Sequence, residues 1–211
     1  QLNAAKAESC ASASHDPVSG LPNRPLFEDR ATRALAQAER TGAGVGILSI
    51  GFDRLPDSED DSDAARAETD LALRRIGTAL GECLRKSDTV AAMARGEFCV
   101  LLAPTDASFD AMVVARRFDE LLRAVDIPGV QLQPHIGIAI YPIDGNDFEA
   151  LSRTADLAMY RSKDLGRARY SFFHADLDTD FRARLELEPG FEHQVAQAQI
   201  GERFAHGAAR I

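Results

Sequence analysis

The spacing of hydrophobic and polar residues changes several times along the chain, and each kind of spacing predicts a helix or a strand. Apolar residues recur three or four positions apart in four stretches, as expected for amphipathic helices, at residues 25–40, 65–85, 107–125 and 147–165. Shorter apolar runs predict five strands, at residues 45–53, 89–93, 98–102, 133–141 and 169–173. The run 45–53 is almost continuously apolar, which is typical of a strand buried on both faces.

This order of elements predicts an α/β (α+β) fold with a central, mixed and largely antiparallel sheet of about five strands flanked by helices. The hairpin formed by the two runs around residue 95 supplies the antiparallel pairing. We assign the domain to residues 16–174. Residues 1–15 are rich in Ala and Ser and are expected to be a linker, and residues 175–211 a C-terminal helical linker with a helix at 178–204. Since the chain starts at Gln1, we expect it to be a piece of a longer protein.

Charge and cysteine content narrow the classes of partner. The chain has 211 residues and a formal net charge of −9, so nucleic acid and anionic membranes are unfavourable partners. No apolar run approaches 20 residues, so no membrane span is expected in this segment. The three cysteines, Cys10, Cys83 and Cys99, show no metal-ligand spacing. We expect Cys83 and Cys99 to be buried free thiols in a reducing compartment, the cytoplasm.

The hairpin tip Ala94-Arg95-Gly96-Glu97-Phe98 is the most informative segment. A tip with two glycines and two acids suits a nucleotide phosphate and its metal, because glycine lets the backbone approach and carboxylates hold Mg²⁺. Here Arg95 lies in the middle and Glu97 is the only acid. The sequence therefore predicts that the hairpin is kept and its chemistry is lost.

Four segments in order resemble the GGDEF domain of bacterial diguanylate cyclases, over residues 16 to 173. They are HDPVSGLPNR from His15, RKSDTV from Arg85, IGIAIYPIDG from Ile136 and ADLAMYRSKDLGR from Ala155. The family joins two GTP molecules into cyclic di-GMP at the interface of an antiparallel dimer, with two metal ions. The segment RLELEPGFEHQ from Arg184 looks like a linker into an EAL phosphodiesterase domain.

The resemblance implies that both metal-ligand positions of the family are glycine here, at Gly51 and Gly96. Only the residual acids Asp53 and Glu97 remain. We therefore expect no catalytic residues, no resident metal and no measurable synthesis of cyclic di-GMP. No cofactor is expected, with Mg²⁺ entering only if GTP is still bound.

The resemblance also carries over GTP contacts. Lys163 and Arg167 match the family's triphosphate contacts, four residues apart at a helix end, and Asp70 matches an acid that reads the guanine edge. Basic residues near a helix C-terminus also have an ordinary explanation in the helix dipole. His135 has no Ser, Cys or Asp partner at a telling spacing and is expected to be structural.

Arg85 and Asp88 match the family's inhibitory R-x-x-D site, which binds cyclic di-GMP five residues before the signature. Arginine can grip guanine or phosphate with two N–H groups, and aspartate can accept from guanine N–H. The alternative is a plain surface ion pair between the two side chains.

We therefore predict a catalytically inactive GGDEF domain that acts as a regulatory or sensory module for cyclic di-GMP or GTP. Its expected partners are adjacent EAL and sensor domains of the same chain, with a homodimer as a further expectation. The alternatives are residual cyclase activity through Asp53 and Glu97, and a dimerising spacer that binds no nucleotide.

Overall fold

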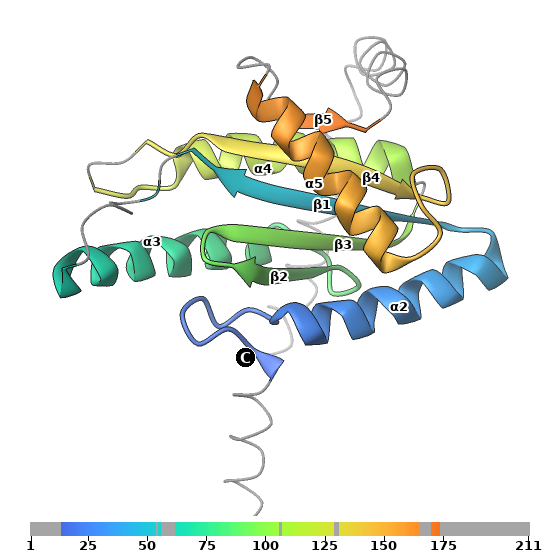
Figure 1. Ribbon diagram of the computed structural model, residues 1–211, viewed down its shortest axis with the longest axis horizontal. Helices are drawn as coiled ribbons and strands as arrows, with labels where there is room; N and C mark the ends of the chain where they lie inside the picture. The colour runs from blue at the N-terminus through green and yellow to red at the C-terminus, as the bar shows by residue number, and fades with distance from the viewer. Residues whose placement is uncertain are drawn as a thin grey trace, which may run out of the picture. The chain divides into compact units, whose positions relative to one another are not determined.

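The computed structural model describes residues 14–53, 55, 62–105, 107–128, 131–164 and 170–173 (Figure 1). Four α-helices lie within these residues: α2 Arg24–Thr41, α3 Asp63–Glu82, α4 Ala107–Ala124 and α5 Phe148–Asp164. Five strands lie there as well: β1 Gly44–Phe52, β2 Thr89–Ala94, β3 Glu97–Thr105, β4 Pro134–Tyr141 and β5 Tyr170–Phe172. No helix among them is both long and apolar enough to cross a membrane.

The five strands form one sheet in the order β2-β3-β1-β4-β5. Strand β1 lies at its centre, antiparallel to β3 on one side and to β4 on the other, and β5 joins β4 in parallel. Seven of the nine residues of β1 are buried. Its near-continuous apolar run follows from that position, since helices cover both faces of the strand.

Two helices cover each face of the sheet. The helix α5 crosses the front of the sheet in Figure 1 and α4 lies behind it. A core cluster that includes Phe27, Ile47 and Leu151 joins α2 and α5 to one face. The ring of Phe27 packs edge-on against that of Phe148, with the ring centroids 5.8 Å apart. On the other face Ala111 of α4 lies against Gly46 of β1.

Local signals set the helix ends. The side chain of Asn23 accepts a hydrogen bond from the backbone of Leu26 at the start of α2, which ends at Gly42 with a φ of +71°. Ser62 caps α3 in the same way by accepting from Ala65. Both helices therefore begin where the chain offers a short polar acceptor.

The expected fold class is confirmed, and most expected elements differ from the observed ones by one or two residues. The helix expected at 65–85 ends at Glu82, because the chain turns there and the backbone N–H of Asp88 donates to the carbonyl of Arg85. The strand expected at 98–102 continues to Thr105, because β1 offers pairing partners as far as Gly44. The expected helix at 178–204 and the terminal linkers, apart from Ser14 and His15, lie outside the described residues.

The expectation for the cysteines holds in part. Cys99 is free and buried in β3, and burial raises the pKa of its thiol to about 12. Cys83 forms no disulfide and is only half-buried, because it follows the last residue of α3. Cys10 lies outside the described residues.

Candidate functional site

The hairpin tip turns at Arg95 and Gly96, between the paired residues Ala94 and Glu97. Gly96 has a φ of +82°, while no non-glycine residue of the described chain has a positive φ. A positive φ at the second central residue alone is what a type II turn requires. A Cβ at position 96 would also lie too close to Cδ1 of Leu55, so that the leucine side chain would have to move. The turn is therefore built for glycine, and an acid there would be strained.

The second glycine of interest lies at the end of β1. A Cβ added to Gly51 would lie 3.0 Å from the sulfur of Met159, a buried residue of α5. The thioether of Met159 therefore covers the place where a carboxylate ligand would have to extend. Across the sheet, Gly51 pairs with His135 of β4.

Asp53 connects three elements just beyond β1. Its carboxylate lies 2.6 Å from Nε2 of His135 in β4 and 2.9 Å from Nζ of Lys163 in α5. Burial works to raise the pKa of Asp53, but hydrogen bonds and charges from Lys163 and His135 outweigh it and lower that pKa. The same contact with Asp53 raises the pKa of Lys163. Both shifts favour the charged forms, so Asp53 and Lys163 form an ion pair in which the two charges neutralise each other.

His135 is a residue whose contact the sequence did not indicate. It was expected to be structural because no partner stands at a telling spacing, yet it meets Asp53, 82 positions earlier, at 2.6 Å. Antiparallel pairing of β1 with β4 creates this neighbourhood. A strand pairing predicted from sequence would have been the signal needed to find it.

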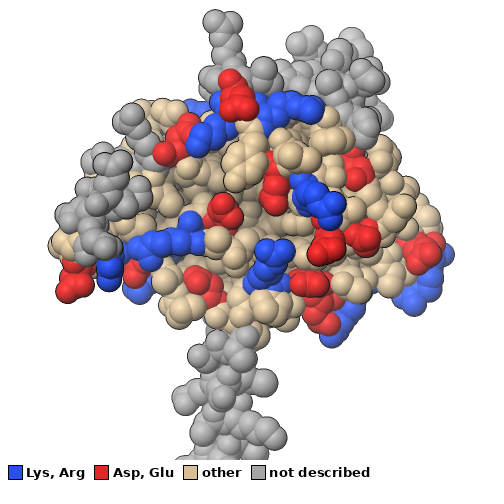
Figure 2. All heavy atoms as spheres, in the orientation of Figure 1, with Lys and Arg blue, Asp and Glu red and all other residues tan. Residues whose placement is uncertain are grey.

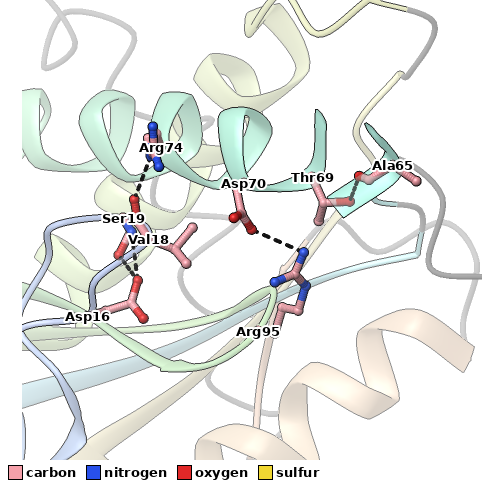
Figure 3. Close-up of polar contacts among 8 residues, drawn as sticks. All are labelled: Asp16, Val18, Ser19, Ala65, Thr69, Asp70, Arg74 and Arg95. Carbon is pink, nitrogen blue, oxygen red and sulfur yellow. Dashed lines mark hydrogen bonds and ion pairs between the residues drawn. The ribbon is translucent and has the colours of Figure 1, made fainter. Parts of the chain in front are cut away.

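Asp70 and Arg95 form an ion pair between α3 and the hairpin tip. The distance from Nη2 of Arg95 to Oδ1 of Asp70 is 3.1 Å, and the side chains are 52% and 31% exposed (Figure 3). This oxygen of Asp70 is itself out of solvent and accepts no hydrogen bond from a described residue. The charge of Arg95 is therefore the main partner of the Asp70 carboxylate.

A groove of about 500 Å³ opens beside the hairpin tip. Its walls are residues 15–19, the start of α2, Leu73 of α3 and the hairpin residues 92–96 and 98. Figure 3 shows how the first wall is anchored. The carboxylate of Asp16 accepts from the backbone and hydroxyl of Ser19, and Arg74 of α3 donates to the carbonyl of Val18. The groove thus has one wall pinned to α3 and one formed by the hairpin.

Arg85 and Asp88 lie in the turn between α3 and β2. Asp88 accepts from the backbone N–H of Arg85 at 3.1 Å and from the hydroxyl of Ser87 at 3.3 Å. Burial raises the pKa of Asp88, against the opposing effect of these hydrogen bonds. The guanidinium of Arg85 is exposed and joins no ion pair among the described residues. Among the described residues the direct contact between the two is through the Arg85 backbone, and the charge of the Arg85 side chain still acts to lower the pKa of Asp88.

Of the remaining expected site residues, Glu97 makes no contact that adds to this geometry among the described residues. Glu97 is exposed and forms no ion pair within the described part of the chain. The helix α5 ends at Asp164, and Arg167 lies outside the described residues. Within residues that are described, no three His, Cys, Asp or Glu side chains gather as a metal site would require.

Charges of both signs are interspersed over the face seen in Figure 2, where blue and red side chains alternate without a continuous field of one sign. A large polyanion finds no extended basic surface on this face.

Comparison with known proteins places these features in a family. A family model described as "Diguanylate cyclase, GGDEF domain" matches residues 13–169. Among curated proteins, the chain is 31% identical over 191 residues to the bifunctional diguanylate cyclase/cyclic di-GMP phosphodiesterase MucR of Pseudomonas aeruginosa. The match covers 89% of this chain and 27% of MucR, so the chain spans about a quarter of that relative.

Solved structures agree with the family match. The crystal structure of the GGDEF domain of TpbB (YfiN) from Pseudomonas aeruginosa is 34% identical, with a TM-score of 0.66, over 73% of this chain and 97% of that one. The GGDEF domain of DgcB from Caulobacter crescentus, in complex with cyclic di-GMP, shares the fold at 21% identity and a TM-score of 0.64. That match covers 76% of this chain and 96% of the DgcB chain.

Proposed function

The chain belongs to the diguanylate cyclase GGDEF domain family, and we propose that it is a non-catalytic member that regulates through nucleotide binding. In this proposal the domain senses cyclic di-GMP at Arg85 and Asp88, holds GTP weakly and works in the cytoplasm. Further domains of a longer protein, such as a sensor and an EAL domain, transmit the signal. A homodimer remains part of this proposal.

The observation that carries the proposal is the state of the two glycine positions. Gly51 lies under the sulfur of Met159, and Gly96 combines a φ of +82° with the side chain of Leu55 above it. Two-metal phosphoryl transfer needs ligands that hold the ions and position both substrates. Removing one well-placed electrostatic partner typically lowers a rate by about 10²–10³. Two such losses argue against turnover.

The residue expected to contact the triphosphate also supports a non-catalytic domain. Lys163, the expected triphosphate contact, already has its ammonium 2.9 Å from the Asp53 carboxylate. An incoming phosphate has to compete with that carboxylate, and it approaches a pair whose charges cancel. Weak GTP binding follows from this arrangement.

The R-x-x-D turn supports recognition of cyclic di-GMP. The Arg85 guanidinium is exposed and forms no ion pair with a described carboxylate, while the turn itself holds Asp88 in place through backbone and Ser87 donors. A preorganised carboxylate beside an exposed guanidinium suits a ligand with guanine edges and phosphate oxygens. The family relative DgcB is described with cyclic di-GMP bound.

Calorimetry and a turnover assay test the proposal together. We expect the chain to bind cyclic di-GMP, Arg85→Ala to weaken that binding at least about tenfold, and Lys86→Ala, which removes a neighbouring exposed charge, to leave it nearly unchanged. Incubation with GTP and Mg²⁺ is expected to yield no cyclic di-GMP above background. Product formation would instead support residual cyclase activity. No heat with either nucleotide would support a dimerising spacer.

A further inference from the structure

Arg95 reaches back from the hairpin tip into the space in front of α3. Its guanidinium lines the groove and lies 3.1 Å from Oδ1 of Asp70 (Figure 3). Leu73, three residues after Asp70 and so on the same face of α3, forms part of the groove wall. Asp70 does not line the groove itself, and its carboxylate is joined to the groove wall by the ion pair with Arg95.

The chemistry around Asp70 suits a flat ligand. Several neighbouring groove walls are apolar, formed by Leu73, Ala92, Met93 and Phe98. One carboxylate oxygen is out of solvent and accepts no hydrogen bond from a described residue. A carboxylate accepts best from two N–H groups that point the same way in one plane. A guanidinium presents that pattern, and so does the N1–H and N2–H edge of guanine.

We propose that Arg95 is an internal competitor for Asp70: its guanidinium excludes from this carboxylate a planar ligand with two adjacent N–H donors, the pattern of the guanine base of GTP. The guanidinium of Arg95 thus keeps the base from the Asp70 carboxylate, while the groove beside it stays open. When Arg95 moves away, Asp70 is open to guanine.

The proposal predicts that removing Arg95 strengthens GTP binding, whereas simple charge attraction predicts that it weakens the binding. If Arg95 were only a basic residue near a polyanionic ligand, its removal would weaken the binding of every nucleotide. If Arg95 competes with guanine, its removal strengthens the binding of GTP and not that of ATP, whose base lacks the paired N–H donors. The direction of the change separates the two interpretations.

We test this with Arg95→Ala and Arg95→Gln, measuring affinity for GTP and ATP in the presence of Mg²⁺. Exposed ion pairs are weak, so the expected gain for GTP is modest, about threefold to fivefold, with no gain for ATP. Adding Asp70→Asn to Arg95→Ala is expected to remove the gain. Asp70→Asn alone is expected to change GTP affinity little, because Arg95 already occupies that carboxylate.

The matched control is Arg33→Ala, which breaks an exposed ion pair with Asp29 on the outer face of α2. It is expected to leave both affinities unchanged. Thermal unfolding of each variant confirms that it is folded. Equal or weaker GTP binding by both Arg95 variants, or an equal gain for ATP, overturns the proposal. Binding of cyclic di-GMP at Arg85 is measured separately, so the failure of one proposal is distinguishable from the failure of the other.

Discussion

At the scale of single residues, the informative positions are those where glycine stands for an acid. At Gly96 the glycine is required by the backbone, because the turn holds φ at +82°. At Gly51 a side chain meets close packing, because an added Cβ would lie 3.0 Å from the sulfur of Met159, which would have to shift slightly. Replacing either glycine by an acid alone would therefore introduce strain or close contacts.

This difference between glycines can be measured. We expect Gly96→Ala to lower the free energy of unfolding by about 1–2 kcal/mol, because an L side chain is strained at positive φ and meets Leu55. The matched variant Gly81→Ala lies in α3, where an added Cβ meets nothing within 4 Å. It is expected to be neutral or to stabilise by about 0.5 kcal/mol. Denaturant unfolding checks both, and equal effects would contradict the role of the turn.

At the scale of elements, the contact of α5 with β4 controls the geometry around Lys163. A Cβ on Gly137 of β4 would run into the backbone of α5, at the carbonyl of Ala155 and the N–H of Met159. The helix can approach the sheet this closely only because residue 137 has no side chain. That approach brings Met159 over Gly51 and Lys163 to Asp53.

We expect Gly137→Ala to destabilise the fold by about 3 kcal/mol, since backbone cannot move aside as a flexible side chain does. The control is Gly46→Ala in β1, where an added Cβ lies 3.5 Å or more from its neighbours. That contact is ordinary, and a change within about 1 kcal/mol is expected. Thermal or denaturant unfolding measures the pair of variants. If both variants unfolded alike, close packing of α5 would not be the cause.

At the scale of the whole molecule, stability depends on pH through Asp53 and Lys163. The pKa of Asp53 is below its ordinary value of 3.8, so its contribution is present above 3.8 and is lost as pH falls through the lowered pKa. The pKa of Lys163 is above 10.5, so its contribution is present below 10.5 and is lost as pH rises through the raised pKa. The pair therefore stabilises the fold between these limits.

Asp53→Asn is expected to make the free energy of unfolding depend less on pH, at both the acid and the alkaline end. Its free energy of unfolding should fall less than that of the unmodified chain when pH is lowered from about 7 to about 3, or raised above about 10. Asp29→Asn, which removes an exposed carboxylate from α2, serves as the control and is expected to leave the alkaline limb unchanged. Parallel curves for the unmodified chain and Asp53→Asn would contradict the pairing.

Much of the fold could be predicted from the sequence, because it depends on local periodicity. The apolar run of β1, the caps Asn23 and Gly42 and the hairpin around Gly96 are each visible within a few residues. Helix and strand ends differed where distant pairing extends an element, as Gly44 does for β3, or where a turn ends it early, as at Arg85. The family resemblance is confirmed over residues 13–169. The cytoplasmic location and the roles assigned to those positions stay predictions.

The sequence by itself determined which chemistry the chain retains, because a side chain is present or absent at Gly51, Gly96, Asp53 and Asp70 whatever the fold. Only the tertiary structure decided which of these groups meet. His135 and Lys163 reach Asp53 from β4 and α5, and Arg95 reaches Asp70 from a hairpin 25 positions later in the chain. The physical reason is that charge interactions depend on distance in space, and sheet pairing and helix packing set that distance without any trace in local periodicity.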